Sequence, residues 1–339
     1  MIIDEVHSSQ SGELSKELTK SLSIEDIDAD EIDYEDWLSQ EMQHRGQQDH
    51  ISYFGFTGTP KKKTIEIFGT RTPEGAFEPF HTYSMHQSIH EGFTLDVLQN
   101  YTTYKRYFKI KQTKDEELEV PTSQGTRELI KFVDSHEITI RNKVNIILDH
   151  WINIGSKEIQ GRARGMIVTQ SRQQCVRYFL EINSQLKERG LRFKSLVGFS
   201  GEVSLDGQKY TESGLNRTIG HDGDVPLGLK NPEFRLLIVA NKFQTGFDEP
   251  LVQSMYVDKR LGGVQCVQTL SRLNRTASGK NQTFVLDFTN EPEVIQKSFQ
   301  EFYQSTILEE ETNPNLSLIH ISEPTRPERI GGGGVGGEK

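Results

Sequence analysis

The chain has 339 residues, which is enough for two compact domains that each bury a core of their own. Its content of 34% hydrophobic and 26% charged residues is that of a polar globular protein, and no run approaches the roughly 20 apolar residues of a membrane span. The net charge of −10 argues against a passive nucleic-acid binder that is basic all over. Two cysteines, Cys175 and Cys266, are too few for a disulfide framework or a zinc site, so we expect a protein of the reducing cytoplasm. Because no apolar run is long enough to span a bilayer, we expect no membrane association.

The first predicted strand lies at the start of the chain and ends in two acids: residues 2–7 read Ile-Ile-Asp-Glu-Val-His. Phosphoryl transfer needs an Asp that holds a metal ion and a Glu beside it, at the carboxyl edge of a sheet. Asp4 would then hold Mg²⁺, and Glu5 would act as general base toward the attacking water. On this motif alone, a surface turn at a strand end explains the residues equally well.

A second predicted strand, residues 51–56, runs into the sequence Thr57-Gly-Thr-Pro60. Small hydroxyl side chains in a tight turn can bond to neighbouring acids and shift with the state of a bound nucleotide. An ordinary turn, favoured by Gly58 and Pro60, is the alternative. We assign residues 1–80 to a first region of the chain and residues 81–135 to a connector.

From residue 136 onward, predicted helices alternate with short apolar strands. The helices are expected at 138–151 and 172–189, and the strands at 165–169, 193–199, 234–240, 254–257 and 283–288. This alternation predicts an α/β domain with a parallel sheet covered on both faces. Functional residues of such sheets lie in the loops after the carboxyl ends of the strands.

The same domain, predicted for residues 136–290, contains a polar, Gly-rich segment at 202–231 that we expect to be a surface insertion. A C-terminal helix is expected within 291–315. Residues 316–326 read Leu-Ser-Leu-Ile-His-Ile-Ser-Glu-Pro-Thr-Arg, which resembles the translation of a transposase-end adapter used in DNA sequencing libraries. We therefore expect residues 316–339 to be a non-native, disordered tail on a gene fragment, with a native disordered tail as the alternative.

Two further motifs lie in the second domain. The apolar strand at 234–240 leads to Thr-Gly-Phe-Asp at 245–248, where Gly246 would let the backbone approach a ligand and Asp248 would contact a ribose or the shell of a metal ion. A plain β-turn is the alternative.

The other motif reads Gln268-Thr-Leu-Ser-Arg272-Leu-Asn-Arg275. On a helix these three polar side chains, at i, i+4 and i+7, would share one stripe. Two fixed guanidiniums suit the charge that grows on a transferring γ-phosphoryl group. A solvated basic helix face explains this motif less well.

In order and spacing, the four motifs resemble superfamily 2 helicase-type motors. Longer strings are closer to one family, the R (motor and nuclease) subunit of type I restriction-modification enzymes: Phe-Gly-Phe-Thr-Gly-Thr-Pro at 54–60, Tyr-Ser-Met-His-Gln-Ser-Ile-His-Glu-Gly-Phe-Thr-Leu-Asp-Val-Leu at 83–98 and Asn-Tyr-Thr-Thr-Tyr at 100–104. The resemblance covers about residues 1–310. It implies tandem RecA-like domains, of which residues 1–80 form an incomplete first lobe. It also implies ATP and Mg²⁺ as cofactors, and hydrolysis coupled to the movement of double-stranded DNA. It also implies the methyltransferase and specificity subunits of the restriction complex as partners.

The resemblance implies a role for each matched residue. Metal and water roles fall to Asp4 and Glu5, arginine-finger roles to Arg272 and Arg275 with Gln268 in support, the lining of the nucleotide cleft to Gly246 and Asp248, and the coupling of hydrolysis to DNA movement to Thr57 and Thr59. The carboxylate pair and the guanidinium pair are then expected to face each other across a shared cleft.

Two departures from the family pattern limit what we expect of this chain. The loop Gly-x-x-x-x-Gly-Lys-Ser/Thr and the Asp…Glu-x-Lys nuclease motif are both absent from the 339 residues. We therefore expect the chain as it stands to bind ATP weakly and neither to translocate nor to cut DNA. A fragment of a superfamily 2 DNA-repair helicase and a catalytically dead nucleic-acid-binding module remain as alternatives.

Overall fold

The computed structural model describes residues 2–3, 54–60, 62–104, 106–107, 140–243 and 247–303. The predicted tail at 316–339 lies outside these ranges. Among the helices in these ranges, none combines the length and the apolar character that a bilayer crossing requires.

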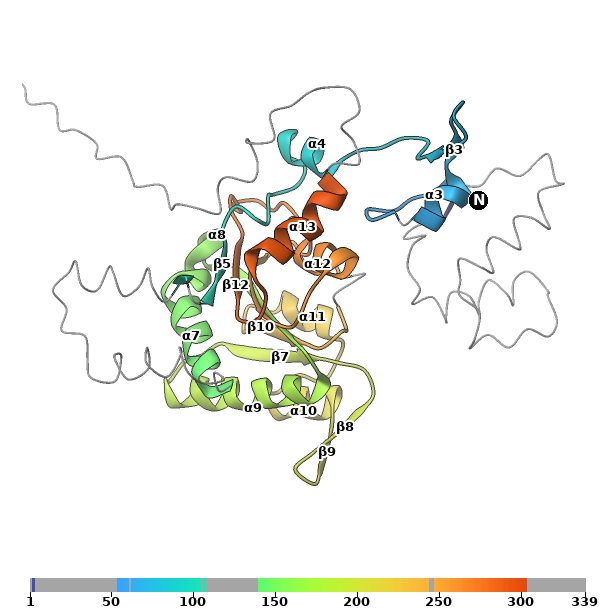
Figure 1. Ribbon diagram of the computed structural model, residues 1–339. Coiled ribbons are helices and arrows are strands. Elements are labelled where there is room, and N and C mark those ends of the chain that lie inside the picture. Colours follow the sequence, from blue (N-terminus) through green and yellow to red (C-terminus); the bar gives the residue numbers. More distant parts are fainter. Residues whose placement is uncertain are drawn as a thin grey trace, which may run out of the picture.

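The largest element is a six-stranded parallel sheet (Figure 1). Its strands, in spatial order, are β5 (Tyr101–Thr103), β12 (Phe284–Asp287), β11 (Val252–Asp258), β6 (Arg164–Thr169), β10 (Phe234–Val239) and β7 (Lys194–Gly198). The register places Ile167 of β6 between Ile238 of β10 and Tyr256 of β11. All neighbouring strands run parallel, so their carboxyl ends share one edge. The predicted α/β class is confirmed.

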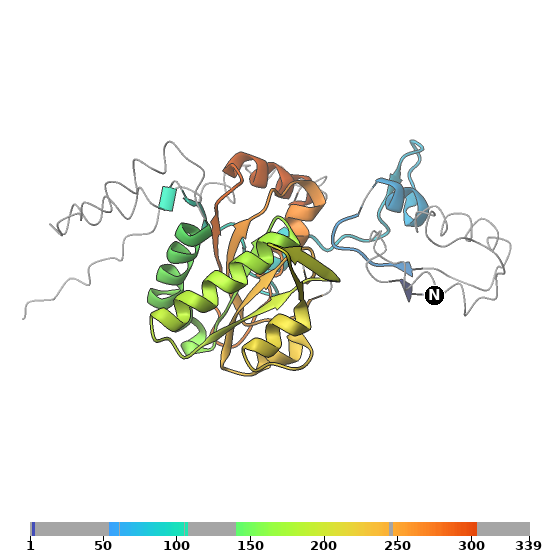
Figure 2. The ribbon, with the colours of Figure 1, turned by 90° about the horizontal axis from the view of Figure 1, so that it is seen from below.

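Helices cover both faces of this sheet (Figure 2). Successive side chains of a strand point to opposite faces, and Met166 and Ile167 of β6 accordingly enter two different cores. The core with Ile167 is closed by α7 (Ile140–Asn153), α9 (Arg172–Glu188) and α10 (Glu212–Thr218). The core with Met166 is closed by α11 (Val225–Lys230), α12 (Gly263–Leu270) and α13 (Pro292–Tyr303).

One close approach explains a glycine in the central strand. Trp151 of α7 is fully buried and lies over Gly165 of β6. A Cβ atom at Gly165 would lie 3.1 Å from a ring carbon of Trp151 and 2.7 Å from Leu236 Cδ2. The glycine therefore lets the helix pack directly against the sheet.

Short elements precede and interrupt the sheet. They are the parallel pair β1 (Ile2–Ile3) and β2 (Phe54–Gly55), the helices α3 (Lys62–Phe68), α4 (Met85–His90) and α8 (Glu158–Gly161), the 3₁₀ turn Gly155–Lys157, and the hairpins β3 (Thr70–Arg71) with β4 (Phe77–Glu78) and β8 (Glu202–Leu205) with β9 (Gln208–Thr211). The two predicted strands of the first lobe thus pair with each other, Ile2 with Phe54 and Ile3 with Gly55.

The prediction of a surface insertion at 202–231 is wrong. This segment forms the hairpin, α10 and α11, and it buries Leu205, Leu215 and Leu229. A buried polar residue, Asn216, belongs to the packing: its side-chain amide accepts from Val197 N at 3.0 Å and donates to Val197 O at 2.9 Å. Residues 202–231 resemble a surface loop in sequence because polar residues such as Asn216 are buried there and hydrogen-bonded to the backbone.

The expected connector, residues 81–135, supplies a strand to the sheet. Tyr101 of β5 pairs with Val285 of β12, and its hydroxyl donates to Asp287 Oδ2 at 2.9 Å. Val97 and Leu98 are buried in the same core as α12 and α13. The sheet therefore extends to residues before 136, while the domain boundaries themselves stay predictions.

Candidate functional site

Helix α12 brings one predicted site residue against the turn that follows β2. Gln268 Nε2 donates to Thr59 Oγ1 at 3.3 Å, a contact between residues 209 positions apart. Thr59 is buried, and its N–H donates to Thr57 Oγ1 at 3.1 Å. The structure thus joins the Thr-Gly-Thr motif to the motif that carries the arginines.

The helical stripe predicted for Gln268, Arg272 and Arg275 is wrong, because α12 ends at Leu270. The next residues form tight turns, with Leu273 N–H donating to Leu270 O at 3.0 Å. Arg275 then forms an isolated antiparallel bridge with Thr94, and Leu95 N–H donates to Asn274 O at 2.7 Å. This pairing with a distant segment takes the backbone groups that a longer helix would have used.

The two guanidiniums nevertheless converge on two neighbouring residues, Phe247 and Asp248. Arg272 Nη1 donates to Phe247 O at 3.0 Å, and its Nε donates to Gln268 O at 3.3 Å. Arg275 forms an ion pair with Asp248 through Nη1 and Oδ1. The structure therefore brings together four predicted residues: Gln268, Arg272, Arg275 and Asp248.

The Arg275–Asp248 pair is open to solvent. The Asp248 side chain is 67% exposed and that of Arg275 is 35% exposed. Exposed ion pairs contribute about 0–1 kcal/mol, because water screens them and side-chain entropy opposes them. An incoming anion with a higher charge density could therefore take Asp248's place.

One residue of this site was missed from the sequence, the buried Lys280. Its Nζ donates to Leu273 O and Arg275 O at 2.8 Å each and to Pro250 O at 3.0 Å. Burial, followed by the nearby Arg275 guanidinium, lowers the pKa of Lys280 to about 7. The surrounding Ser-Gly-Lys sequence reads as a polar turn, so nothing local signals a buried cation.

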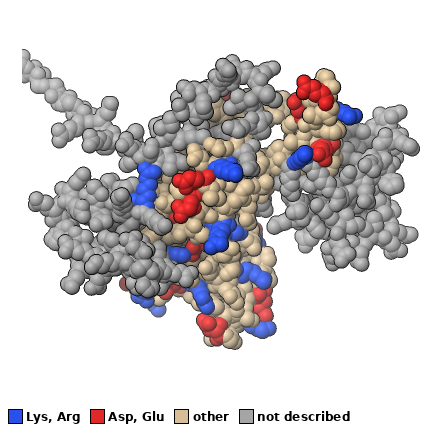
Figure 3. Space-filling view, viewed as in Figure 1, with Lys and Arg blue, Asp and Glu red and all other residues tan. Residues whose placement is uncertain are grey.

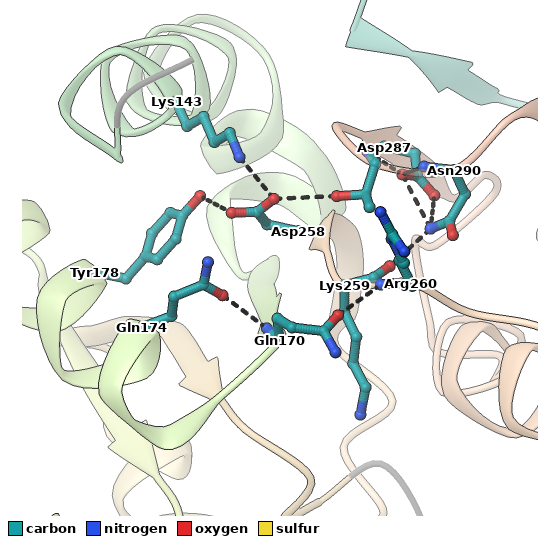
Figure 4. A network of polar contacts seen from close by, with 10 residues as sticks. Lys143, Gln170, Gln174, Tyr178, Asp258, Lys259, Arg260, Asp287 and Asn290 are labelled. Carbon is teal, nitrogen blue, oxygen red and sulfur yellow. Dashed lines mark hydrogen bonds and ion pairs between the residues drawn. The ribbon is translucent and has the colours of Figure 1, made fainter. Parts of the chain in front are cut away.

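A second polar cluster lies at the carboxyl ends of β11 and β12 (Figure 4). Asp258 accepts from Lys143 Nζ at 2.7 Å, Tyr178 OH at 2.8 Å and Thr289 Oγ1 at 3.1 Å. Burial raises the pKa of Asp287, while backbone N–H groups, including that of Thr289 at 2.8 Å, lower it. The cluster ties α7 and α9 to these two strand ends.

The same cluster orients the loop after β11. Asn290 Nδ2 donates to Lys259 O at 2.7 Å, and Lys259 Nζ donates to Asn241 Oδ1 at 2.6 Å. Gln170 Oε1 accepts from Arg260 N–H at 2.9 Å, and the side chains of both residues are exposed. None of these residues was predicted, because their partners lie far apart in the sequence.

Three predicted site residues, Asp4, Glu5 and Gly246, lie outside the described residues. The predicted cleft between the acid pair and the arginine pair therefore stays a prediction. In the described part of the chain no three His, Cys, Asp or Glu residues cluster as metal ligands would. The amide and guanidinium donors of Gln268, Arg272 and Arg275 suit the oxygens of a polyphosphate.

Comparison with known proteins gives consistent results. A family model described as type I restriction enzyme subunit R domain 3 matches residues 207–290, a range that includes the arginine pair. The endonuclease subunit of the type I restriction enzyme SauCOLORF180P from Staphylococcus aureus (strain COL) is 28% identical over 273 residues, which cover 68% of this chain and 27% of the relative. The endonuclease subunit of the type I restriction enzyme HindI from Haemophilus influenzae is 22% identical over 277 residues, covering 76% and 25%.

Among solved structures, a fragment assigned to an HsdR subunit of a type I restriction enzyme from Vibrio vulnificus YJ016 aligns with a TM-score of 0.44. It is 14% identical, and the alignment covers 78% of this chain and 44% of that chain. This chain spans about a quarter of the length of the curated relatives that it matches.

The parallel sheet covered by helices on both faces defines the class of this part of the chain, an α/β domain. Within that class, the chain is a relative of the R subunits of type I restriction enzymes, and residues 207–290 correspond to their domain 3. The family predicted from the motifs is thereby confirmed.

Proposed function

We propose that this chain is part of the ATP-dependent DNA translocase of a type I restriction R subunit, and that Arg272 and Arg275 act on the transferred phosphoryl group. The observation that carries the proposal is the convergence of both guanidiniums with Gln268 beside the Thr57–Thr59 turn. In this arrangement the segment after α12 presents cationic donors near the turn that follows β2.

The predicted site residues would bind and orient the nucleotide. ATP with Mg²⁺ supplies the transferable phosphoryl group and neutralises part of its charge, with Asp4 holding the metal and Glu5 activating the water. Arg275 would exchange Asp248 for a phosphoryl oxygen, because charge-assisted hydrogen bonds to a more highly charged anion are stronger. Gly246 and Asp248 would line the cleft, and Thr57 and Thr59 would report its occupancy through Gln268.

Double-stranded DNA and the methyltransferase and specificity subunits are the partners that this assignment implies, in the cytoplasm. On the face shown in Figure 3, basic and acidic residues are interspersed over the described part rather than separated into one basic patch. Contacts through a local groove fit this distribution better than binding to a broad basic surface.

We further propose that the 339-residue chain alone does not turn over ATP, because it contains no phosphate-binding loop with its Lys. ATP hydrolysis by the purified chain, measured with and without duplex DNA, tests this directly. Robust hydrolysis that DNA stimulates would contradict it.

The role of the arginines is tested in a fusion to an upstream R-subunit segment that carries the phosphate-binding loop. We expect DNA-stimulated hydrolysis to appear, and Arg275→Ala to lower kcat by about 10³-fold or more, the range for an arginine finger. Arg217→Ala is the matched control, because Arg217 of α10 forms an exposed ion pair, with Asp222 beyond the end of the helix. A folded fusion that stays inactive would favour a catalytically dead module.

A further inference from the structure

The ammonium of Lys280 lies where the two segments with Asp248 and Arg275 meet. Pro250 O, one acceptor, lies two residues after Asp248 on the stretch that leads into β11. The other two acceptors, Leu273 O and Arg275 O, belong to the turns after α12. One cation therefore connects both halves of the arginine site.

The geometry uses the full donor capacity of the side chain. A protonated Lys has three N–H donors and no acceptor, and three carbonyl oxygens lie within 3.0 Å of Nζ. With 5% exposure, the group has little access to water that could replace a lost partner. A buried carbonyl that loses its donor is left unsatisfied and destabilises the folded arrangement, so removing the ammonium should release these segments from each other.

The turn that carries Lys280 is itself fixed. Lys280 N–H donates to Ala277 O at 2.9 Å, and Arg162 Nη2 donates to Ser278 O at 2.6 Å. Gly279 has a φ of +83°, a backbone conformation that favours glycine. The backbone turn thus fixes the position of Lys280, and the Lys280 ammonium in turn binds the backbone carbonyl of Arg275.

We propose that Lys280 is a positioning residue that fixes the backbone of Arg275 against Pro250, so that the guanidinium meets Asp248. The placement rests on the contacts alone. Its meaning for catalysis, which is to hold the arginine for the phosphoryl group, rests on the proposed function.

The protonation state of Lys280 should matter for this role. Burial, and then the Arg275 guanidinium, lower the pKa of Lys280 to about 7, while Glu249 opposes this shift. A neutral amine has one N–H donor fewer. The hold on Arg275 should therefore loosen as the pH rises through neutrality.

Amide hydrogen exchange of the full 339-residue chain tests the placement without any nucleotide. The probe is Leu95 N–H, because it donates to Asn274 O; the reference is the amides of the central strand β6. In Lys280→Met we expect exchange at Leu95 to rise about tenfold with β6 unchanged, since local opening is independent of global unfolding. Lys143→Met is the matched control, because it removes a lysine ion pair at Asp258 and should leave Leu95 unchanged.

Two further measurements keep the test decisive if Lys280→Met does not fold. In the unmodified chain, Leu95 protection should fall as the pH rises from 6 to about 8.5 after correction for the intrinsic rate. In Lys280→Arg, which keeps the charge, exchange should lie between those of the unmodified chain and Lys280→Met. Equal acceleration of Leu95 and β6 in Lys280→Met, or a flat pH profile, would overturn the proposal.

The catalytic meaning is tested separately in an active fusion. Lys280→Met should lower kcat more than it changes KM, and the double variant with Arg275→Ala should be no slower than Arg275→Ala alone. If the fusion is inactive while Leu95 still responds selectively, the proposed function fails and the placement stands. Additive losses in the double variant would show that Lys280 does not act through Arg275.

Discussion

The side chain of His150 is polar, yet it is buried in the core. It stacks on Phe284 with ring centroids 3.9 Å apart, and its Nδ1 lies 2.7 Å from Tyr256 OH. Its Nε2 has no hydrogen-bond partner in the part of the chain that the structure describes. Burial lowers the pKa of His150 to about 4, so the imidazole is neutral at physiological pH.

This histidine should make the protein sensitive to acid. Between pH 6.5 and about 4, the unfolded chain takes up a proton at His150 that the folded chain does not, so lowering the pH favours unfolding. The contribution is at most roughly 3 kcal/mol, from the ordinary value of 6.5 to about 4. His150→Asn should flatten the decline of unfolding free energy in this window, as measured by urea denaturation at several pH values. Exposed His86→Asn serves as the control, and equal slopes in both variants would contradict the assignment.

The residues of the arginine motif could be predicted from the sequence, whereas the buried lysine that holds their backbone could not. Gln268, Arg272 and Arg275 follow from spacing within a few residues, and the structure brings them to one place. Lys280 acts on carbonyl groups of Pro250 and Leu273, and a carbonyl leaves no signature in the sequence.

Element boundaries depend on both local and distant signals. Helix α9 begins after Ser171, whose side chain accepts from Gln174 N–H at 3.2 Å, a cap that can be read from the sequence. Helix α12 ends where residues 274–275 pair with residues 94–95, and no local signal marks this end. Helix starts are therefore easier to predict here than the end of α12.

The N-cap of α9 leads to a prediction about stability. Ser171→Ala should lower the free energy of unfolding by about 1 kcal/mol, because the first turn loses an acceptor for an exposed N–H. Chemical denaturation of the two proteins measures the difference. Ser184→Ala, on the exposed side of the same helix, is the control. A loss no larger than that of the control would show that Ser171 does not cap the helix.

The whole molecule draws its sheet from segments far apart in the sequence. The five strands predicted after residue 136 are present, because each is a short apolar run flanked by helices. Strand β5 was not predicted, since its three residues Tyr-Thr-Thr are short and half polar. It joins the sheet by pairing with β12, with Tyr101 opposite Val285 and Thr103 opposite Asp287. Side-chain hydrogen bonds, Asn100 to Thr283 and Tyr101 to Asp287, add contacts between residues 183 and 186 positions apart.

A pair of truncations tests this arrangement. A chain that begins at residue 84 keeps α4 and β5, while one that begins at residue 108 loses both, together with the buried Val97, Leu98, Tyr101 and Tyr104. We expect the second to melt at least roughly 10 °C lower or without a cooperative transition, because each lost core side chain costs a few kcal/mol. Differential scanning calorimetry measures both. Equal melting temperatures would show that residues 84–107 are dispensable for the domain.

The side-chain amide of Asn216 has a consequence for how copies of this protein behave toward one another. It saturates the outward N–H and C=O of Val197 on the outermost strand of the sheet, β7. An outermost strand with free backbone groups is a template on which a foreign strand can add and begin aggregation. A foreign strand that paired with β7 at Val197 would first have to displace the amide of Asn216.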